Sequence, residues 1–323
     1  MKRRTSLAVI VAAVAAFSHA CWAQEWPNKA VKVIVPFAAG SSPDIVARLV
    51  ADVLRQENKG QPFIVENKAG AGGNIGTETI AKSPADGYTI GVSIGGPLAI
   101  NTMLVKDLRY VPSRDIAPIS ILVSQPSVLA VHSSVPAKTV AELIALMKKE
   151  PGKLNYGSIG NGSLSHLGME AVAHKAGAAI THVPYPGSPA AVTALLRNDV
   201  QVAMLPASSL VAQAGSGQYR MLAVSTANRA PTLPDLPTLV ESGIDVDADA
   251  WIGLIAPAGT PQPILDALQR SAAKAMQDPG IREKLTLQHI VAVGSPSQTL
   301  KDRMASEITR WKPIIEAAKI EAN

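Results

Sequence analysis

The 323-residue sequence has one cysteine, few aromatic residues and no block of basic residues. A single cysteine, Cys21, can form no internal disulfide and no zinc site built on several thiolates. An aromatic share of 4% without a basic cluster argues against a nucleic-acid-binding surface. After the first 23 residues, no apolar run is long enough to cross a bilayer.

The usual signatures of catalysis are also missing. No two histidines have the His-x-x-x-His spacing of a zinc helix, and no G-x-S-x-G nucleophile motif occurs. Ser163 and His166 could form the nucleophile and base of a secreted hydrolase, but no third group or oxyanion hole can be named for them. We expect no catalytic residue, metal or cofactor, and keep the hydrolase as the alternative.

The first 23 residues have the three parts of a secretory signal peptide. Three positive charges at residues 2–4 precede an uncharged run from Leu7 to Phe17, and a small residue, Ala23, follows. We place cleavage after Ala23 and consider lipid attachment at Cys21 the weaker alternative. Cleavage would remove the only thiol and lower the net charge from +5 to +2. We therefore expect a globular protein in the periplasm.

Residues 31–57 predict a strand, a loop of small residues and a helix. Val31 to Val35 is a β-branched run, and apolar residues recur every three or four positions from Ile45 to Leu54. Helix-start N–H groups lack intrahelical partners and attract anions, and small side chains leave them uncovered. The predicted ligand contacts in this first loop are Phe37, Ala38, Ala39, Gly40, Ser41, Ser42 and Asp44.

The same order of elements follows twice more. A strand at 63–65 leads into glycines at 70–76, and a strand at 88–94 ends at Gly95, which we add to the predicted contacts. A dinucleotide site is disfavoured because Ile75 replaces the third glycine of G-x-G-x-x-G. Strands alternating with helices predict a parallel sheet with its loops gathered at the carboxyl ends of the strands.

A second glycine-rich loop follows the strand at 154–158, about 120 residues after the first loop. A further loop follows the strand at 180–183. Two such regions suit two lobes that face each other across a cleft. The predicted contacts here are Ser158, Gly160, Asn161, Gly162, Ser163, His166, Tyr185, Gly187 and Ser188. We expect the acidic run at 245–249 to be solvated, and assign no chemistry to the helices predicted at 263–277 and 297–312.

Six motifs in this order resemble the Bug-type substrate-binding proteins of tripartite tricarboxylate transporters, and they cover essentially the whole mature chain. They are Pro36-Phe37-Ala38-Ala39-Gly40 with Asp44, Ala47 and Arg48; Glu66-Asn67 with Gly70-Ala71-Gly72-Gly73 and Gly76; Ala85-Asp86-Gly87-Tyr88-Thr89; Tyr156-Gly157-Ser158 with Gly160, Gly162-Ser163 and His166-Leu167; His182-Val183-Pro184-Tyr185 with Gly187; and Ala256-Pro257-Ala258-Gly259-Thr260-Pro261.

The resemblance implies an α/β, two-lobed fold like that of type II periplasmic binding proteins, each lobe a mainly parallel sheet flanked by helices. We expect lobe 1 at 24–127 and 245–323, and lobe 2 at 128–244. A small organic carboxylate would lie between the lobes of a monomer, which would deliver it to membrane permease subunits. A receptor for a membrane signalling partner remains an alternative.

The sequence departs from the family pattern at three positions. Ser41 stands where a second glycine is usual, Pro186 replaces a lysine, and Gln201 replaces a common aspartate. We include Gln201 among the ligand contacts. An aspartate there could pair with an amino group of a ligand, so its absence favours a plain mono- or dicarboxylate over an amino acid.

Overall fold

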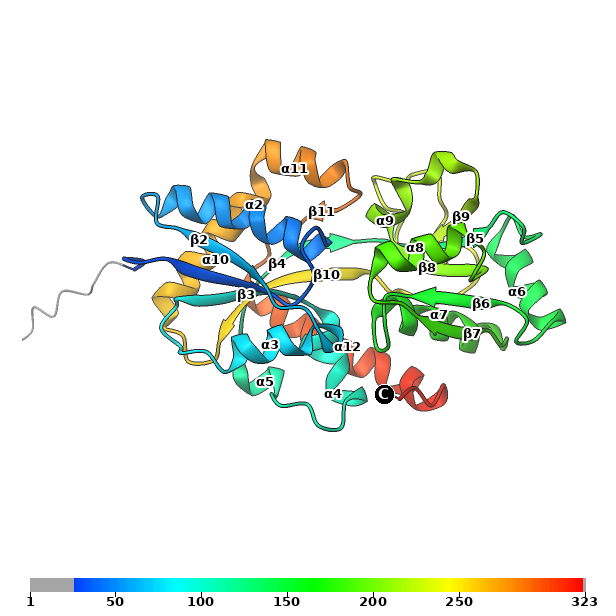
Figure 1. The fold of residues 1–323 in the computed structure, drawn as a ribbon, viewed down its shortest axis with the longest axis horizontal. Helices are drawn as coiled ribbons and strands as arrows, with labels where there is room; N and C mark the ends of the chain where they lie inside the picture. Colours follow the sequence, from blue (N-terminus) through cyan, green and yellow to red (C-terminus); the bar gives the residue numbers. More distant parts are fainter. Residues whose placement is uncertain (1–25, 322–323) are drawn as a thin grey trace, which may run out of the picture.

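The computed structural model describes residues 26–321 as two α/β lobes, each with its own sheet (Figure 1). The predicted signal peptide, with Cys21 and the cleavage site, lies outside the described residues. Within them, no helix has both the length and the apolar character needed to cross a membrane.

The first sheet has six strands in the order β11-β4-β10-β3-β1-β2. β1 pairs in parallel with β2 and β3, whereas β10 is antiparallel to both of its neighbours. The strands are β1 (Val31–Val35), β2 (Phe63–Asn67), β3 (Thr89–Ile94), β4 (Ile116–Gln125), β10 (Ala250–Pro257) and β11 (Val291–Ala292).

The second sheet has five strands in the order β7-β6-β8-β5-β9. β6 is parallel to β7 and β8, and β5 is antiparallel to both β8 and β9. The strands are β5 (Ser127–His132), β6 (Asn155–Ser158), β7 (Thr181–Pro184), β8 (Val202–Pro206) and β9 (Tyr219–Val224).

The two sheets follow one plan. In each sheet, three strands that follow one another in the chain pair in parallel, and the first of the three lies between the other two. An antiparallel strand then pairs with the third strand and separates it from the next strand of the sheet. The succession β2-β1-β3-β10-β4 thus corresponds to β7-β6-β8-β5-β9. Each sheet is mixed, with one strand direction predominating, and the predicted two-lobed α/β fold is confirmed.

Helices cover both faces of each sheet (Figure 1). In the first lobe, α2 and α10 lie on one face, while α3 and α12 lie on the other. The helices here are α2 (Ser42–Glu57), α3 (Asn74–Ala81), α4 (Asn101–Leu104), α5 (Pro112–Asp115), α10 (Gln262–Gln277), α11 (Pro279–Thr286) and α12 (Ser297–Ala317), with the short turns η1 (Ala71–Gly73) and η2 (Gly96–Ile100).

In the second lobe, α8 and α9 pack on one face of the sheet and α7 on the other. The helices are α6 (Val140–Lys149), α7 (Leu164–Ala176), α8 (Ser188–Leu196), α9 (Ala207–Val211) and the short turn η3 (Ala214–Ser216). The predicted capping box at Thr139 is present, because its side chain accepts a hydrogen bond from the Glu142 N–H.

The chain crosses between the lobes at two places, and α12 also joins them. Gln125 ends β4 in the first sheet and Ser127 begins β5 in the second. Ile244, Val246 and Ala248 pack with the second-lobe core. We therefore propose that the second boundary lies near residue 249, later than the expected 244/245.

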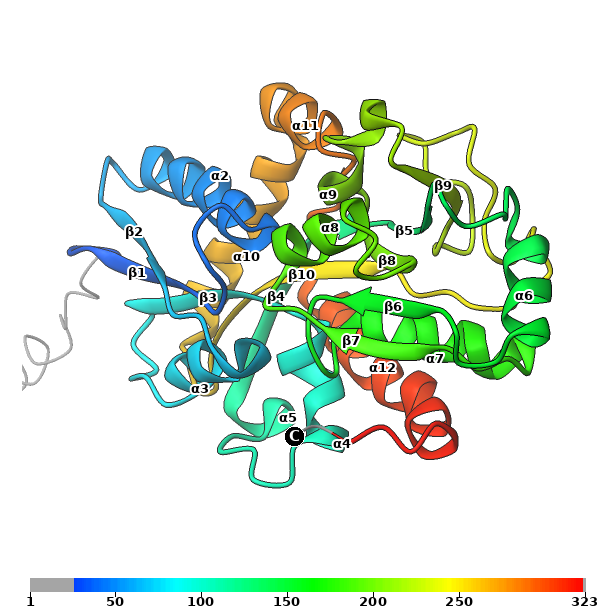
Figure 2. The ribbon, with the colours of Figure 1, turned by 45° about the vertical axis from the view of Figure 1, so that its right-hand side comes forward.

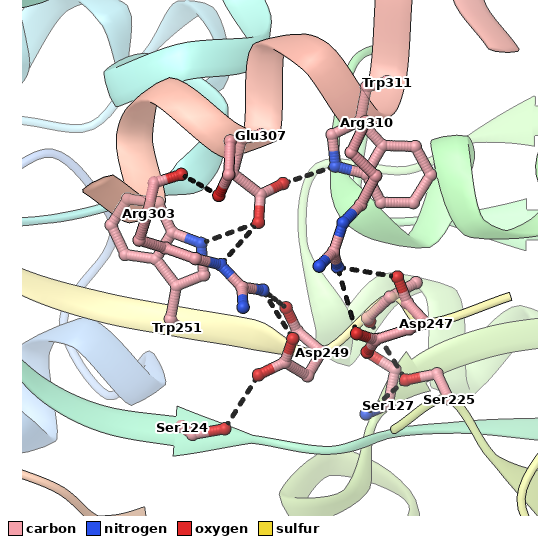
Figure 3. A network of polar contacts seen from close by, with 12 residues as sticks. Ser124, Ser127, Ser225, Asp247, Asp249, Trp251, Arg303, Glu307, Arg310 and Trp311 are labelled. Carbon is pink, nitrogen blue, oxygen red and sulfur yellow. Dashed lines mark hydrogen bonds and ion pairs between the residues drawn. The ribbon is translucent and has the colours of Figure 1, made fainter. Parts of the chain in front are cut away.

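The acidic run at 245–249 is not solvated as expected, except at Asp245. Asp249 pairs with Arg303 of α12 and accepts a hydrogen bond of 3.0 Å from the Ser124 hydroxyl (Figure 3). Asp247 pairs with Arg310 at 3.3 Å. Burial, followed by the charge of Asp249, raises the pKa of Asp247. These two ion pairs thus hold the second crossing against α12.

Glu307 lies at the centre of this network and is fully buried. Its carboxylate accepts hydrogen bonds from the indole N–H groups of Trp251 and Trp311, and pairs with Arg303 at 2.7 Å (Figure 3). Trp251 belongs to a first-lobe cluster, and Trp311 packs in the second-lobe core. Glu307 therefore ties α12 to Trp251 of β10 and holds Trp311, on the next turn of α12, in the second-lobe core.

We predict that Glu307→Ala lowers the free energy of unfolding by about 3–5 kcal/mol, because two buried indole N–H groups lose their acceptor and Arg303 loses one of its two carboxylate partners. Urea titration followed by tryptophan fluorescence measures the change. Glu316→Ala, at an exposed position of the same helix, is the control. Equal stability of the two variants would contradict a structural role for Glu307.

Candidate functional site

The loop between β1 and α2 leaves the start of the helix open. Ser41 is the N-cap residue by backbone conformation, but its hydroxyl makes no capping hydrogen bond. That hydroxyl oxygen is buried and has no partner within the described residues. The N–H groups of Ser42 and Asp44 also have no acceptor there, as expected in the first turn of a helix. The turn therefore offers three unused donors.

Asp44 does not serve as a free group of this loop. Its buried carboxylate accepts hydrogen bonds from the Gly40 N–H (2.9 Å), the Arg48 guanidinium (2.9 and 3.0 Å) and the Asn67 amide (2.9 Å). Burial raises the pKa of Asp44, but these hydrogen bonds outweigh burial and lower it. Asn67 also binds the Phe37 carbonyl at 3.0 Å. The Asp44 carboxylate therefore positions the loop, and its N–H group is the part of the residue that remains without an acceptor in the described residues.

The second-lobe loop closes on itself in a similar way. The Ser163 hydroxyl donates to the Gly160 carbonyl at 2.6 Å and caps α7 by accepting from the His166 N–H. The Ser158 hydroxyl accepts from the Gly160 N–H at 3.1 Å. Gly160 and Gly162 have φ values of +126° and +71°, which favour glycine. The hydroxyls of Ser158 and Ser163 are thus used within the loop. The N–H groups of Gly160, Gly162 and Ser163 are used there too, so that among residues 160–163 the Asn161 N–H is left without an acceptor from the described residues.

Two stacked histidines support this loop from behind. The rings of His166 and His182 lie 3.8 Å apart and nearly parallel. His166 Nδ1 accepts from the Gly162 N–H at 3.2 Å, and His182 Nε2 lies 2.6 Å from the Ser158 hydroxyl. Burial, then the neighbouring His182, lowers the pKa of His166 to about 3, and burial lowers that of His182 to about 4. Both rings are therefore neutral, and each supports the loop through a hydrogen bond.

His166 and Asn161 face a separate space. Together with Glu170, His182 and residues 318–321, they line a cavity of about 280 Å³ beside the end of α12. Ser163 and His166 share only the capping contact, with no bond between hydroxyl and imidazole. The hypothetical nucleophile–base pair therefore has no support in the geometry.

Four further predicted contacts lie in two places, three of them after β7 and one after β3. Tyr185, Gly187 and Ser188 follow β7 beside the second-lobe loop, since the Tyr185 N–H donates to the Ser158 carbonyl at 3.0 Å. Gly95 directly follows β3 and precedes η2, with its backbone against Trp251.

Gln201 is a correction. It precedes β8 and so lies at the amino-terminal ends of the parallel strands, opposite to the ends that carry the loops. There its side chain accepts a hydrogen bond from the Asn155 N–H and donates one to the Asn198 carbonyl. Its amide is therefore occupied within the second lobe, so we remove Gln201 from the site. The preference for plain carboxylates that rested on Gln201 loses its basis.

Each of the two loops lies against the opposite lobe. A Cβ atom at Gly162 would lie 2.7 Å from Leu104 Cδ1 and 3.1 Å from Asn101 Oδ1, so the second-lobe loop presses against α4 of the first lobe. On the other side, the N-terminal end of α2 points toward the lobe of α8 and α9 (Figures 1 and 2).

Gln125 and Ser208 were missed from the sequence. Gln125 Nε2 lies 2.5 Å from the Ser208 hydroxyl of α9 and 3.4 Å from the Ser42 hydroxyl of α2, so it bridges the lobes. A signal was available for Ser208, because Pro206-Ala207-Ser208-Ser209 after a buried strand repeats the pattern of the first loop. Gln125 carried no signal, since a single polar residue at a strand end is ordinary.

Two lobes of this topology, with open helix starts and backbone-lined loops between them, define a solute-binding receptor of the periplasmic binding protein type. The family model described as the tripartite tricarboxylate transporter family receptor matches residues 46–320. The chain belongs to this family, whose members are receptors and not enzymes, and the hydrolase alternative is wrong. BugT of Bordetella pertussis is 34% identical over 98% of this chain and 97% of its own length.

Solved structures agree with this assignment. The periplasmic binding protein BugD shares 31% identity with a TM-score of 0.82, over 92% of this chain and 100% of its own. An R. palustris protein solved with adipate shares 33% identity with a TM-score of 0.86, over 92% and 99%. MatC from Rhodopseudomonas palustris, with bound malate, shares 29% identity with a TM-score of 0.81, over 90% and 100%.

We predict that Asp44→Asn lowers the free energy of unfolding by about 1–3 kcal/mol, because the charge that accepts from Arg48 is lost. It should also weaken ligand binding, since Gly40 loses its anchor. Chemical denaturation and calorimetry measure the two effects. Asp52→Asn, at an exposed position of the same helix, should change neither. An unchanged Asp44→Asn protein would remove Asp44 as the brace of the loop.

The neutral histidines predict a pH dependence of stability. An unfolded histidine has a pKa near 6.5, whereas His166 and His182 are held near 3 and 4. The unfolded state therefore binds more protons below about pH 6.5, and the contribution of the two histidines to stability declines from there to about pH 4 for His182 and about pH 3 for His166.

His166→Gln should flatten this decline, because glutamine accepts from Gly162 without titrating. Thermal melts from pH 7.5 to 4.5 compare it with wild type and with His174→Gln, at an exposed position of α7. Identical slopes in all three proteins would refute the prediction.

Proposed function

We propose that the chain binds a small organic carboxylate between its lobes, contacting the first turn of α2 on one side and the second-lobe loop at residues 160–163 on the other. The observation that carries this proposal is the set of unused donors at α2, namely the Ser41 hydroxyl and the N–H groups of Ser42 and Asp44. Helix-start donors favour an anion.

The electrostatics of the turn support an anionic ligand. Asp44 is the acidic residue of this turn, and Arg48 pairs with both of its oxygens. An incoming carboxylate therefore meets no uncompensated negative charge there. Two relatives, solved with adipate and with malate, bind dicarboxylates, which supports a dicarboxylate here.

We further propose that the protein is exported by its N-terminal segment, acts in the periplasm as a monomer and delivers its ligand to membrane permease subunits. The family assignment supports these steps, because the matching model describes a transporter receptor. Native mass spectrometry of purified protein tests the monomer and identifies any ligand carried through purification.

Ser41→Ala gives a direct test of the ligand site. The Ser41 hydroxyl is buried without a partner, so its removal should leave the ligand-free melting temperature unchanged or slightly higher. Affinity for the bound dicarboxylate should fall about 10- to 100-fold, as for a hydrogen bond to a charged group. Calorimetry with adipate, malate and succinate measures it.

Ser113→Ala is the matched control, since Ser113 is exposed on α5. It should bind with wild-type affinity. If Ser41→Ala binds as tightly as this control, the start of α2 does not hold the carboxylate and the proposed site is wrong.

A further inference from the structure

Gln125 occupies an unusual place in the molecule. It is the last residue of β4, immediately before the chain enters the second lobe, and it is 3% exposed. Its amide nitrogen is within reach of one hydroxyl from each lobe, Ser42 and Ser208. Its amide oxygen accepts no hydrogen bond from the described residues. This oxygen is not among the buried side-chain atoms that lack a partner, so it is open to water or to a ligand.

The neighbouring residue shows which way Gln125 faces. The Ser124 side chain points toward Asp249 and the α12 network (Figure 3). Successive side chains of a strand point to opposite faces, so Gln125 faces away from α12. That opposite face is where the starts of α2 and α9 converge. At the first crossing, one face of the chain therefore contacts the α12 network, and the opposite face is directed at the proposed ligand.

The contacts of Gln125 differ in strength. The 2.5 Å contact with Ser208 is short, whereas the 3.4 Å contact with Ser42 is at the long limit of a hydrogen bond. A carboxylate oxygen is a stronger acceptor than a hydroxyl. A ligand seated on the unused donors of α2 can therefore take over the second N–H of the amide.

We infer that Gln125 is a ligand-contacting residue on the floor of the inter-lobe site, where its amide donates to a ligand carboxylate while Ser208 orients it. The inference rests on the proposed function and adds a residue from the crossing between the lobes. It also explains selectivity for anions, because a neutral donor lies where an acidic side chain would repel the ligand.

Charge substitution at this position tests the inference. Using the mature full-length protein, calorimetry with adipate and malate compares wild type with Gln125→Glu and Gln125→Met. We expect Gln125→Met, which keeps the volume but removes the amide, to bind about tenfold more weakly. Gln125→Glu should lose at least about a hundredfold at pH 7.5, because like charges then meet in a poorly solvated space.

The pH profile separates ligand contact from a structural effect. Binding to Gln125→Glu should recover as the pH falls toward 5 and the new carboxyl takes up a proton, whereas Gln125→Met should follow the wild-type profile. A merely structural role would lower the melting temperature of both variants without this recovery. Gln218→Glu carries the same charge change at an exposed position and should bind like wild type.

Ser208→Ala keeps the inference testable if Gln125→Glu fails to fold. Loss of the short contact should weaken binding about three- to tenfold without changing the ligand-free melting temperature. Wild-type affinity in Ser208→Ala and Gln125→Met, or in Gln125→Glu at pH 7.5, overturns the inference while leaving carboxylate binding intact. Failure of the wild-type protein itself to bind any carboxylate would instead overturn the proposed function.

Discussion

The rest of the proposed site depends on the pairing of the Asp44 carboxylate with Arg48, which compensates its negative charge. A carboxylate near the start of α2 would normally interact with the positive end of the helix dipole and with the free N–H groups there. Here Arg48, Asn67 and the Gly40 N–H satisfy it, on the side of the turn that faces the protein. The remaining donors of the turn stay free, and the loop that carries them is fixed. An anion can bind there without displacing an internal partner.

The repeated topology places a comparable loop in the second lobe. The loop between β1 and α2 meets Ser208, which follows β8, through Gln125, and the loop between β6 and α7 meets α4, which follows β3. Under the correspondence of the two sheets, β8 is the counterpart of β3, so these are equivalent contacts. The lobes thus meet twice through corresponding pairs of elements.

The sequence was sufficient for the fold and for the first-lobe loop, because both rest on local patterns. β-branched runs, small-residue loops and helix periodicity mark strands and helix starts within short windows. It failed where the outcome depends on distant partners. Asp247 and Asp249 looked solvated because nothing local reveals Arg303 and Arg310, about 55 to 65 residues later. Gln201 failed for a related reason: sheet pairing, not spacing, decides which strand end it occupies.

The first crossing joins the proposed ligand site to the network of α12. Ser124 contacts the Asp249–Arg303–Glu307 network, and Gln125, the next residue, contacts both lobes on the opposite face. Rotation of one lobe against the other would change the separation of Ser42 and Ser208, which Gln125 spans. In the proposed site, a ligand held by α2 and Gln125 gains full contact only in arrangements that keep these groups together. Its differential affinity therefore shifts the population toward such arrangements, as any ligand-driven closure requires.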